Sequence, residues 1–259
     1  MPEKAKGEIL MGAIGLVLPT GKPAEADWPE TEKAVLLSVV MPVYNEVGTV
    51  LSVVDRVLGL DLDLELIVVD DGSIDGTREL LADLEHDRVR VVFHERNRGK
   101  GAAVRTGFGQ VRGEYVTIQD ADLELNPAEI PQLLVPLLEG QADVVYGSRF
   151  MYGWKHRAWV NGFANWFLSG LTNLLYGTRV RDMEACYKVF RTEVLQRFEL
   201  RADRFDFEPE ITAKLAKLGL QIVELPITYR PRDFVDGKKI HWRDGLQAVY
   251  TLLKYRFVN

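Results

Sequence analysis

The 259-residue chain carries 32 Lys and Arg against 38 Asp and Glu, a formal net charge of −6, and 47% of its residues are hydrophobic. This length and hydrophobic content suit one large domain, or a domain with an appendage, and the acidic balance predicts no nucleic-acid partner. The single cysteine, Cys186, excludes an internal disulfide framework and is compatible with a reducing compartment.

The first residues are expected to form an N-terminal arm or linker, residues 1–33. The apolar run at residues 9–18 falls well short of the ~20 residues that a spanning helix needs. Glu3 and Glu8 also argue against a secretory signal. Residues 19–33 hold three prolines and many charges, which is typical of a linker.

From residue 34 onward, β-prone apolar runs alternate with helical patterns. The predicted strands are Leu36–Met41, Leu64–Val69, Val89–Phe93, Tyr115–Ile118 and Val144–Tyr146. The predicted helices run from Asn45 or Glu46 to about Leu58, from Asp75 to Leu84, from the Gly99–Gly101 turn to Val111, and from Asn126 to Leu138. This alternation predicts an α/β fold with a Rossmann-like, doubly wound, mostly parallel sheet.

The pattern changes after residue 150, where an amphipathic helical part is expected. Further helices are predicted over Ala158–Tyr176, Glu208–Leu218 and Asp244–Phe257, and a strand over Gln221–Tyr229. The first of these helices has a polar face made of Asn161, Asn165, Ser169, Thr172 and Asn173, with aromatic residues elsewhere. Its aromatic residues suit a bilayer interface, although ordinary core packing is the alternative, and its asparagines argue against a transmembrane span.

Polar clusters follow the predicted strands, at the edge where ligands bind in such sheets. Tyr44 and Glu46 could stack on a nucleobase and accept from it, or could belong to a helix cap. Asp70 could bind ribose or base, or could form an Asx turn. Lys100 could lie near a phosphate at a helix N-terminus. Neither GxGxxG nor GxxxxGK[ST] occurs, so neither a dinucleotide-binding motif nor a P-loop is predicted.

An acidic cluster follows the fourth predicted strand. Asp120, Asp122 and Glu124 alternate, and in an extended chain such side chains point to the same side. Carboxylate oxygens are ligands that Mg²⁺ prefers and shares with phosphates, so the cluster predicts a divalent cation, with a solvated acidic loop as the alternative.

Charge is also divided along the chain. Residues 1–148 carry 13 Lys and Arg against 26 Asp and Glu, whereas residues 149–259 carry 19 against 12. The first part therefore suits a cation, and the second suits an anion such as a phosphate or lipid headgroup, unless the division is ordinary surface charge.

Taken in order, these motifs resemble family 2 glycosyltransferases with the GT-A fold, over residues 36 to about 240. The chain looks most like the dolichol- or polyprenyl-phosphate sugar synthases. That narrower resemblance depends on Asp120–Glu124, Gly147–Arg149, Asp182–Arg191, Arg232 and Gly237–Lys239. The expected organisation is a GT-A domain over residues 34–240, followed by a C-terminal amphipathic helix over residues 241–259.

The resemblance also implies site residues. A nucleotide sugar, GDP- or UDP-hexose, would be bound by Pro42, Tyr44, Glu46, Asp70, Asp71, Lys100 and Asp120. Mg²⁺ or Mn²⁺ would be held against the diphosphate by Asp120, Asp122 and Glu124. The acceptor phosphate would be bound by Arg149, Arg157 and Arg232, with Asp122 and Arg149 as the catalytic residues.

The expected function is an inverting, metal-dependent transfer of mannose or glucose to a polyprenyl (dolichyl or undecaprenyl) phosphate, by a peripheral enzyme at the cytoplasmic face of a membrane. A phosphate acceptor is already ionised, whereas an alcohol acceptor would need a general base, for which Glu184 is the best candidate.

The alternatives are a soluble or glycan acceptor, a non-catalytic nucleotide-sugar sensor and a sugar nucleotidyltransferase. The last is disfavoured because no Gly-rich, Arg-containing signature occurs near the N-terminus. A Gln-x-x-Arg-Trp motif is absent, which argues against a processive polysaccharide synthase.

Overall fold

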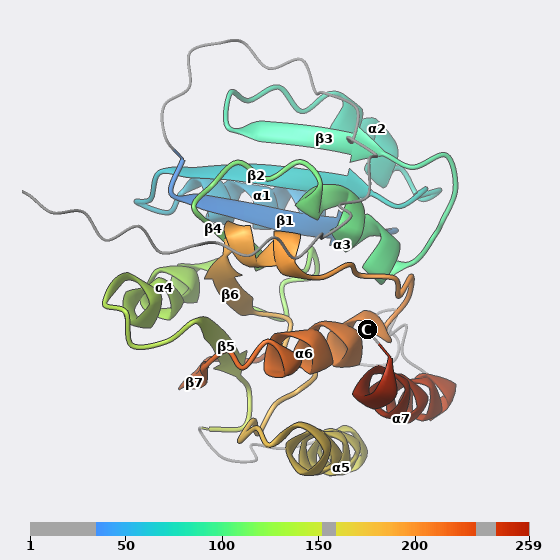
Figure 1. The fold of residues 1–259 in the computed structure, drawn as a ribbon. Helices are drawn as coiled ribbons and strands as arrows, with labels where there is room; N and C mark the ends of the chain where they lie inside the picture. The colour runs from blue at the N-terminus through green and yellow to red at the C-terminus, as the bar shows by residue number, and fades with distance from the viewer. Residues whose placement is uncertain (1–34, 152–158, 232–241, 259) are drawn as a thin grey trace, which may run out of the picture. The chain divides into compact units, whose positions relative to one another are not determined.

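The computed structural model describes residues 35–151, 159–231 and 242–258. The fold is that of the unit Thr31–Asn259 (Figure 1). The predicted arm, residues 1–33, lies outside the described residues.

A seven-stranded sheet forms the centre of this unit, and it confirms the expected α/β class. Its strands are β1 (Leu37–Val43), β2 (Leu64–Asp70), β3 (Val89–Phe93), β4 (Tyr115–Ile118), β5 (Val144–Ser148), β6 (Lys188–Arg191) and β7 (Ile222–Pro226). Their order is β3-β2-β1-β4-β6-β5-β7, and only β6 among them runs antiparallel to its neighbours. β6 was not predicted from the sequence, because four residues that begin and end with a charge give little strand signal.

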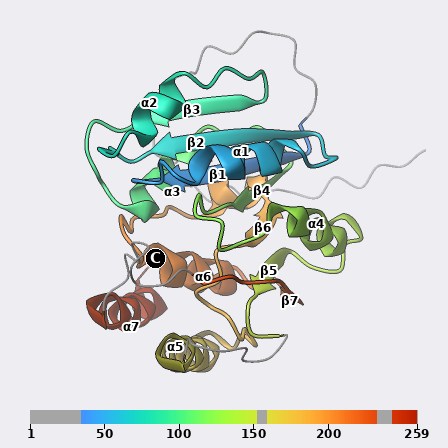
Figure 2. The ribbon, with the colours of Figure 1, turned by 180° about the vertical axis from the view of Figure 1, so that it is seen from behind.

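Helices lie on both faces of the sheet. They are α1 (Val50–Leu58), α2 (Thr77–Ala82), α3 (Lys100–Phe108), α4 (Ile130–Leu138), α5 (Trp159–Tyr176), α6 (Phe207–Lys217) and α7 (Trp242–Phe257), with 3-10 turns at Pro127–Glu129 and Thr192–Arg197. Figure 1 shows α3 in front of the sheet, and Figure 2, from behind, shows α1 in front of it. The side chains of β1 and β2 are therefore buried on both sides, as expected for continuous apolar strands.

Several predicted boundaries differ from the observed ones by a few residues. The first helix was expected from Asn45 or Glu46 but begins at Val50, because Asn45 adopts a left-handed φ of 54° and the loop bonds to a neighbouring loop instead. The strand predicted over Gln221–Tyr229 begins at Ile222 and ends at Pro226.

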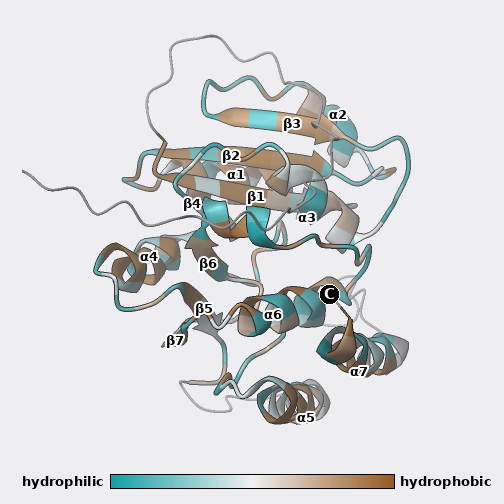
Figure 3. Ribbon diagram, viewed as in Figure 1, coloured by the Kyte–Doolittle hydropathy of each residue, from teal (hydrophilic) through white to brown (hydrophobic). Residues whose placement is uncertain are grey.

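The amphipathic helix α5 turns its polar side inward. Asn165 Nδ2 and Ser169 Oγ both donate to the Arg181 carbonyl, at 3.0 and 3.1 Å. The exposed side instead carries Phe163, Trp166, Phe167 and Leu174, which are 65%, 62%, 49% and 82% exposed. Figure 3 shows hydrophobic residues along this helix, which has no charged side chain. The side chains of Trp159 and Asn161 lie outside the described part.

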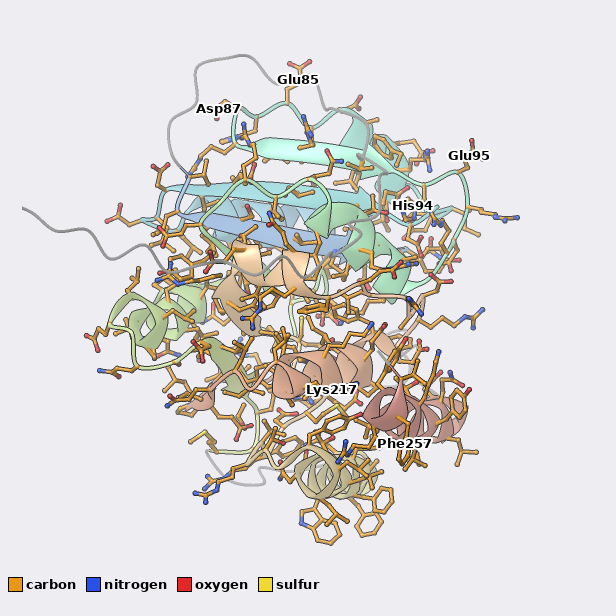
Figure 4. The ribbon with its side chains drawn as sticks, in the orientation of Figure 1. Glu85, Asp87, His94, Glu95, Lys217 and Phe257 are labelled. Atoms are coloured by element: carbon orange, nitrogen blue, oxygen red, sulfur yellow. The ribbon has the colours of Figure 1, made fainter. Side chains whose placement is uncertain are left out.

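Helix α7 lies beside α5 and α6 and is bonded to the latter at its end. Lys217 Nζ, from the last turn of α6, donates to the Val258 carbonyl at 3.0 Å, and Figure 4 labels Lys217 and Phe257 there. The exposed side of α7 carries the apolar residues Leu246, Tyr250, Leu253 and Phe257 together with the exposed polar residues Gln247, Lys254 and Arg256. None of the described helices is long and apolar enough to cross a membrane.

Candidate active site

The loops that follow β1, β2, β4 and β5 meet at one edge of the sheet, because these strands share a direction. The structure thus brings together the polar clusters predicted after each strand. Two of these loops bond directly to each other. Asn45 N–H donates to Ser73 Oγ at 2.9 Å, and Glu46 N–H donates to Thr77 Oγ1 at 2.9 Å. Glu46 is buried, and its carboxylate accepts from Thr49 Oγ1 at 3.1 Å.

Asp70 is a fully buried carboxylate with partners inside the protein. Its Oδ2 accepts from Arg78 at 3.1 Å, and its Oδ1 accepts from the Ser73 N–H at 3.3 Å. The second bond is the turn-type contact that was the alternative to ribose binding. Asp70 therefore helps to hold the end of β2, and its contact with a nucleotide stays a prediction.

Asp71 anchors the loop that leads into α3. Its Oδ2 accepts from the Gly99 N–H at 2.7 Å, and its Oδ1 accepts from the Arg98 N–H at 2.9 Å and lies 2.7 Å from His94 Nδ1. His94, labelled in Figure 4, is also buried, and its Nε2 lies 2.9 Å from Thr106 Oγ1 in α3. Both oxygens of Asp71 are thus bonded to protein groups, so Asp71 fixes the position of the α3 N-terminus.

Gly72 allows the loop after β2 to approach the loop that leads into α3 closely. Its φ is +73°, and a Cβ there would lie 2.5 Å from the Arg96 carbonyl carbon. Only glycine fits both the left-handed backbone and the close approach.

Lys100, the first residue of α3, is paired with a predicted metal ligand. Its Nζ lies 2.8 Å from Asp120 Oδ1 and 3.5 Å from Glu208 Oε1. Burial disfavours the charged lysine, but the neighbouring carboxylates raise its pKa well above the usual value. Burial would also raise the pKa of Asp120, yet Lys100 lowers it below its usual value. Both groups are therefore charged at neutral pH.

The acidic loop after β4 differs from its predicted form. β4 ends at Ile118, and Leu123 adopts a φ of 59°, so the extended-chain alternation does not hold. The Glu124 N–H donates to Asp122 Oδ1 at 3.1 Å, and Glu124 Oε2 accepts from the Tyr229 hydroxyl at 2.9 Å. Among the described residues, no three His, Cys, Asp or Glu residues form a group that could hold a metal ion.

Arg149 forms a two-pronged ion pair with a carboxylate that the sequence did not reveal as its partner. Its Nε and Nη2 donate to the two oxygens of Asp182 at 2.8 and 2.7 Å, and Asp182 is fully buried. Its Nη2 also donates to the Glu184 carbonyl at 3.1 Å, and the guanidinium lies 5.3 Å from the centre of the Tyr229 ring. The pair thereby joins two segments of the site, residues 149–151 and residues 182–184.

Glu184 is a titratable group beside this pair. Burial, followed by the negative charge of Glu208, raises the pKa of Glu184 to about 7, against the opposing effect of Lys188 and Arg149. Glu208 and Lys188 form a buried ion pair behind it. No motif pointed to Glu208 or Tyr229, and Lys188 lies within the Asp182–Arg191 motif without an expected role, because the pairing partners are far away in the sequence. Arg157, Arg232 and Gly237–Lys239 lie outside the described residues.

Comparisons with known proteins identify the family of this chain. Residues 38–198 match the model of the family described as Glycosyl transferase family 2. Polyprenol monophosphomannose synthase from Mycolicibacterium smegmatis is 34% identical over 208 residues, which cover 75% of this chain and 77% of that protein. Undecaprenyl-phosphate mannosyltransferase from Micrococcus luteus is 31% identical over 210 residues, covering 77% and 85%.

A solved structure shows the same similarity. The crystal structure of glucosyl-3-phosphoglycerate synthase from Mycobacterium tuberculosis, in complex with Mn²⁺, UDP and glucosyl-3-phosphoglycerate, superposes with a TM-score of 0.65. It is 25% identical, and the match covers 87% of this chain and 81% of that one.

The Arg149–Asp182 pair predicts a stability effect. Arg149→Lys keeps the charge but loses the planar fork, so a buried Asp182 oxygen loses its donor. We expect the free energy of unfolding in urea to fall by about 1–3 kcal/mol. The exposed Arg197→Lys is the control and should change it by less than about 0.5 kcal/mol. Equal stability of the two variants would contradict a structural role for the pair.

The raised pKa of Glu184 predicts a pH effect. Between about pH 4.5 and 7 the folded protein binds more protons at this carboxyl than the unfolded chain does, so the carboxyl lowers stability as pH rises through this window. Glu184→Gln cannot ionise. The difference in melting temperature between variant and wild type should therefore favour the variant more at pH 8 than at pH 5. A difference independent of pH would show that Glu184 ionises normally.

Proposed function

Since the chain belongs to glycosyl transferase family 2, we propose that this glycosyltransferase moves mannose or glucose from a nucleotide sugar to polyprenyl phosphate, with inversion at the anomeric carbon. The observation that carries the proposal is the Lys100–Asp120 pair, which lies at the N-terminus of α3 beside the acidic loop. A helix N-terminus and a lysine are groups that bind a diphosphate. The names of the relatives support polyprenyl phosphate as the acceptor.

The donor would lie across the carboxyl edge of the sheet. The loop of Pro42, Tyr44 and Glu46 would contact the nucleoside, and the α3 N-terminus would face the diphosphate. Lys100 then stabilises the negative charge that develops as the bond to the anomeric carbon breaks. Asp70 and Asp71 would act chiefly by holding the two loops in place, because their oxygens bond to protein groups.

The donor set of the acidic loop fits a hard divalent cation. Mg²⁺ is commonly bound through one or two carboxylates together with substrate phosphates, so a ready-made cage is not required. Asp120 and Asp122 would hold Mg²⁺ or Mn²⁺, with Glu124 beside them. The ion would neutralise charge on the diphosphate.

The acceptor phosphate would approach from the side of Arg149. A phosphate is ionised at neutral pH and needs no general base to attack the sugar. Arg149 stays charged because Asp182, acting against the cost of burial, raises its pKa above the usual value. Arg157 and Arg232 remain the further candidates for the acceptor phosphate.

We propose that α5 and α7 bring the enzyme to the cytoplasmic face of a membrane as a peripheral protein. The exposed aromatic residues of α5 match those that enter a bilayer interface, and Lys254 and Arg256 on α7 suit anionic headgroups. The polar side of α5 meanwhile holds the backbone of Arg181 and Met183, next to Asp182. A membrane contact of α5 would therefore lie close to the partner of Arg149.

A hydroxyl acceptor is the second candidate. Glu184 favours it, because a carboxyl with a pKa of about 7 suits a general base. Phosphoglyceric acid, bound with Mn²⁺ and UDP in a structure of the same neighbour, is a soluble hydroxyl compound of the kind that this alternative requires.

A transfer assay tests the main proposal. GDP- and UDP-sugars are incubated with Mn²⁺ or Mg²⁺, with and without polyprenyl phosphate, and nucleotide release is measured. We expect release that depends on the lipid phosphate and is abolished by EDTA and by Asp122→Ala, with an unchanged melting temperature. Full activity in EDTA would reject the metal, and equal turnover with a phosphate-free acceptor would reject the lipid phosphate.

Vesicle sedimentation tests the membrane contact. Replacing Phe163 and Trp166 together by serine should reduce binding to vesicles that contain anionic lipid, because an interfacial anchor loses its apolar area. The matched control replaces Val135 and Leu138 on α4, 45% and 54% exposed, by serine. Equal losses in both double variants, or no binding by wild type, would contradict the assignment to α5.

A further inference from the structure

A row of alternating charges runs from the acidic loop into the protein. Asp120 pairs with Lys100, Lys100 lies between Asp120 and Glu208, and Glu208 pairs with Lys188. Exposure falls along the row, from 27% for the Asp120 side chain to 4% for Glu208 and 0% for Lys188. Lys100 is therefore the one member with a carboxylate on each side, at the boundary between the acidic loop and the interior.

Glu208 has an oxygen that is not fully used. Its Oε2 accepts from Lys188, which also donates to the Ala185 carbonyl. Its Oε1 is buried and accepts no hydrogen bond from any described residue, although Lys100 Nζ lies 3.5 Å away. A buried carboxylate oxygen without a donor is costly, so such a group in a native fold calls for an explanation.

Binding of the nucleotide sugar and its metal would explain why this oxygen lacks a hydrogen bond. A divalent cation on Asp120 would compete with Lys100 for the same carboxylate and repel its ammonium group. Lys100 Nζ needs to move by less than about 1 Å to reach hydrogen-bonding distance of Glu208 Oε1. It would then stay at the N-terminus of α3 instead of turning away from the site.

We propose that Glu208 is a positioning residue, which takes over Lys100 from Asp120 when donor and metal bind and thereby holds Lys100 toward the diphosphate. The inference rests on the proposed function for the donor and its metal, but not on the acceptor. Lys188 binds Oε2 and so fixes the carboxylate of Glu208, which leaves Oε1 available to Lys100. Glu208 acts through Lys100 and touches neither substrate nor metal.

Calorimetry of GDP and UDP binding, in Mn²⁺ and in EDTA, tests this role. Glu208→Gln should weaken nucleoside diphosphate binding about tenfold in Mn²⁺, the effect of losing one charged hydrogen bond, and by much less in EDTA. Lys100→Gln should weaken it similarly, and the double variant should be no weaker than Lys100→Gln alone. Additive losses, or an equal loss in EDTA, would overturn the proposal.

The matched control is Glu65→Gln, which removes another buried carboxylate from an ion pair, with Arg112, at the opposite edge of the sheet. It should lower the melting temperature without changing nucleotide affinity. If Glu208→Gln behaves like Glu65→Gln, the role of Glu208 is structural and the proposal is wrong. If Glu208→Gln does not fold, Glu208→Asp, which keeps the charge but shortens the reach, should give an intermediate loss in Mn²⁺, and wild-type affinity would overturn the proposal.

The outcome is separable from that of the proposed function. Nucleotide binding with the expected Glu208 effect, but no transfer to polyprenyl phosphate, would reject the acceptor and keep the role of Glu208. Transfer with unaltered nucleotide affinity in Glu208→Gln would do the reverse. A wild-type protein that binds neither nucleotide would overturn both.

Discussion

The buried carboxylate of Asp71 is the constraint on which the donor side of the site depends. By accepting from the backbone of Arg98 and Gly99, it determines where α3 begins, and so where Lys100 projects. His94 completes the arrangement, because it joins the same carboxylate to Thr106 inside α3. The position of Lys100 is thus set by groups that are themselves removed from solvent, which limits how far the helix N-terminus can move.

Asp182 is a second buried carboxylate, and it fixes the position of Arg149 on the other side of the site. Asp182 receives the fork of Arg149, while the polar side of α5 and the carboxylate of Glu224 bind the backbone around it. The polar face of α5 points inward because it binds the loop around Asp182. The apolar face of this amphipathic helix is consequently exposed. Both sides of the site follow one principle, in which a buried carboxylate fixes a charged side chain or the backbone beside it.

The strands up to residue 148 and most helices were predictable, since they are long apolar runs with clear period and turn residues. The clusters after the strands were predictable too, because a parallel sheet collects its strand ends at one edge. The short antiparallel β6 was not, and neither was the pairing of Arg149 with Asp182 or of Glu208 with Lys188. These contacts join residues that are distant in the chain, and nothing local to either partner indicates the other. The alternation of Asp120, Asp122 and Glu124 misled because the strand ends two residues before it begins.

The place of β6 in the sheet has a consequence for how the molecule is made. β4 and β5 do not touch as strands, since β6 lies between them and pairs with both. On the ribosome, strands β1 to β4 can assemble once residue 118 has emerged. β5 cannot join this sheet until residues 188–191, which form β6, have been synthesised. The apolar β5 segment therefore stays unpaired while about forty further residues are translated. An unpaired apolar segment in a nascent chain is prone to aggregate or to pair wrongly.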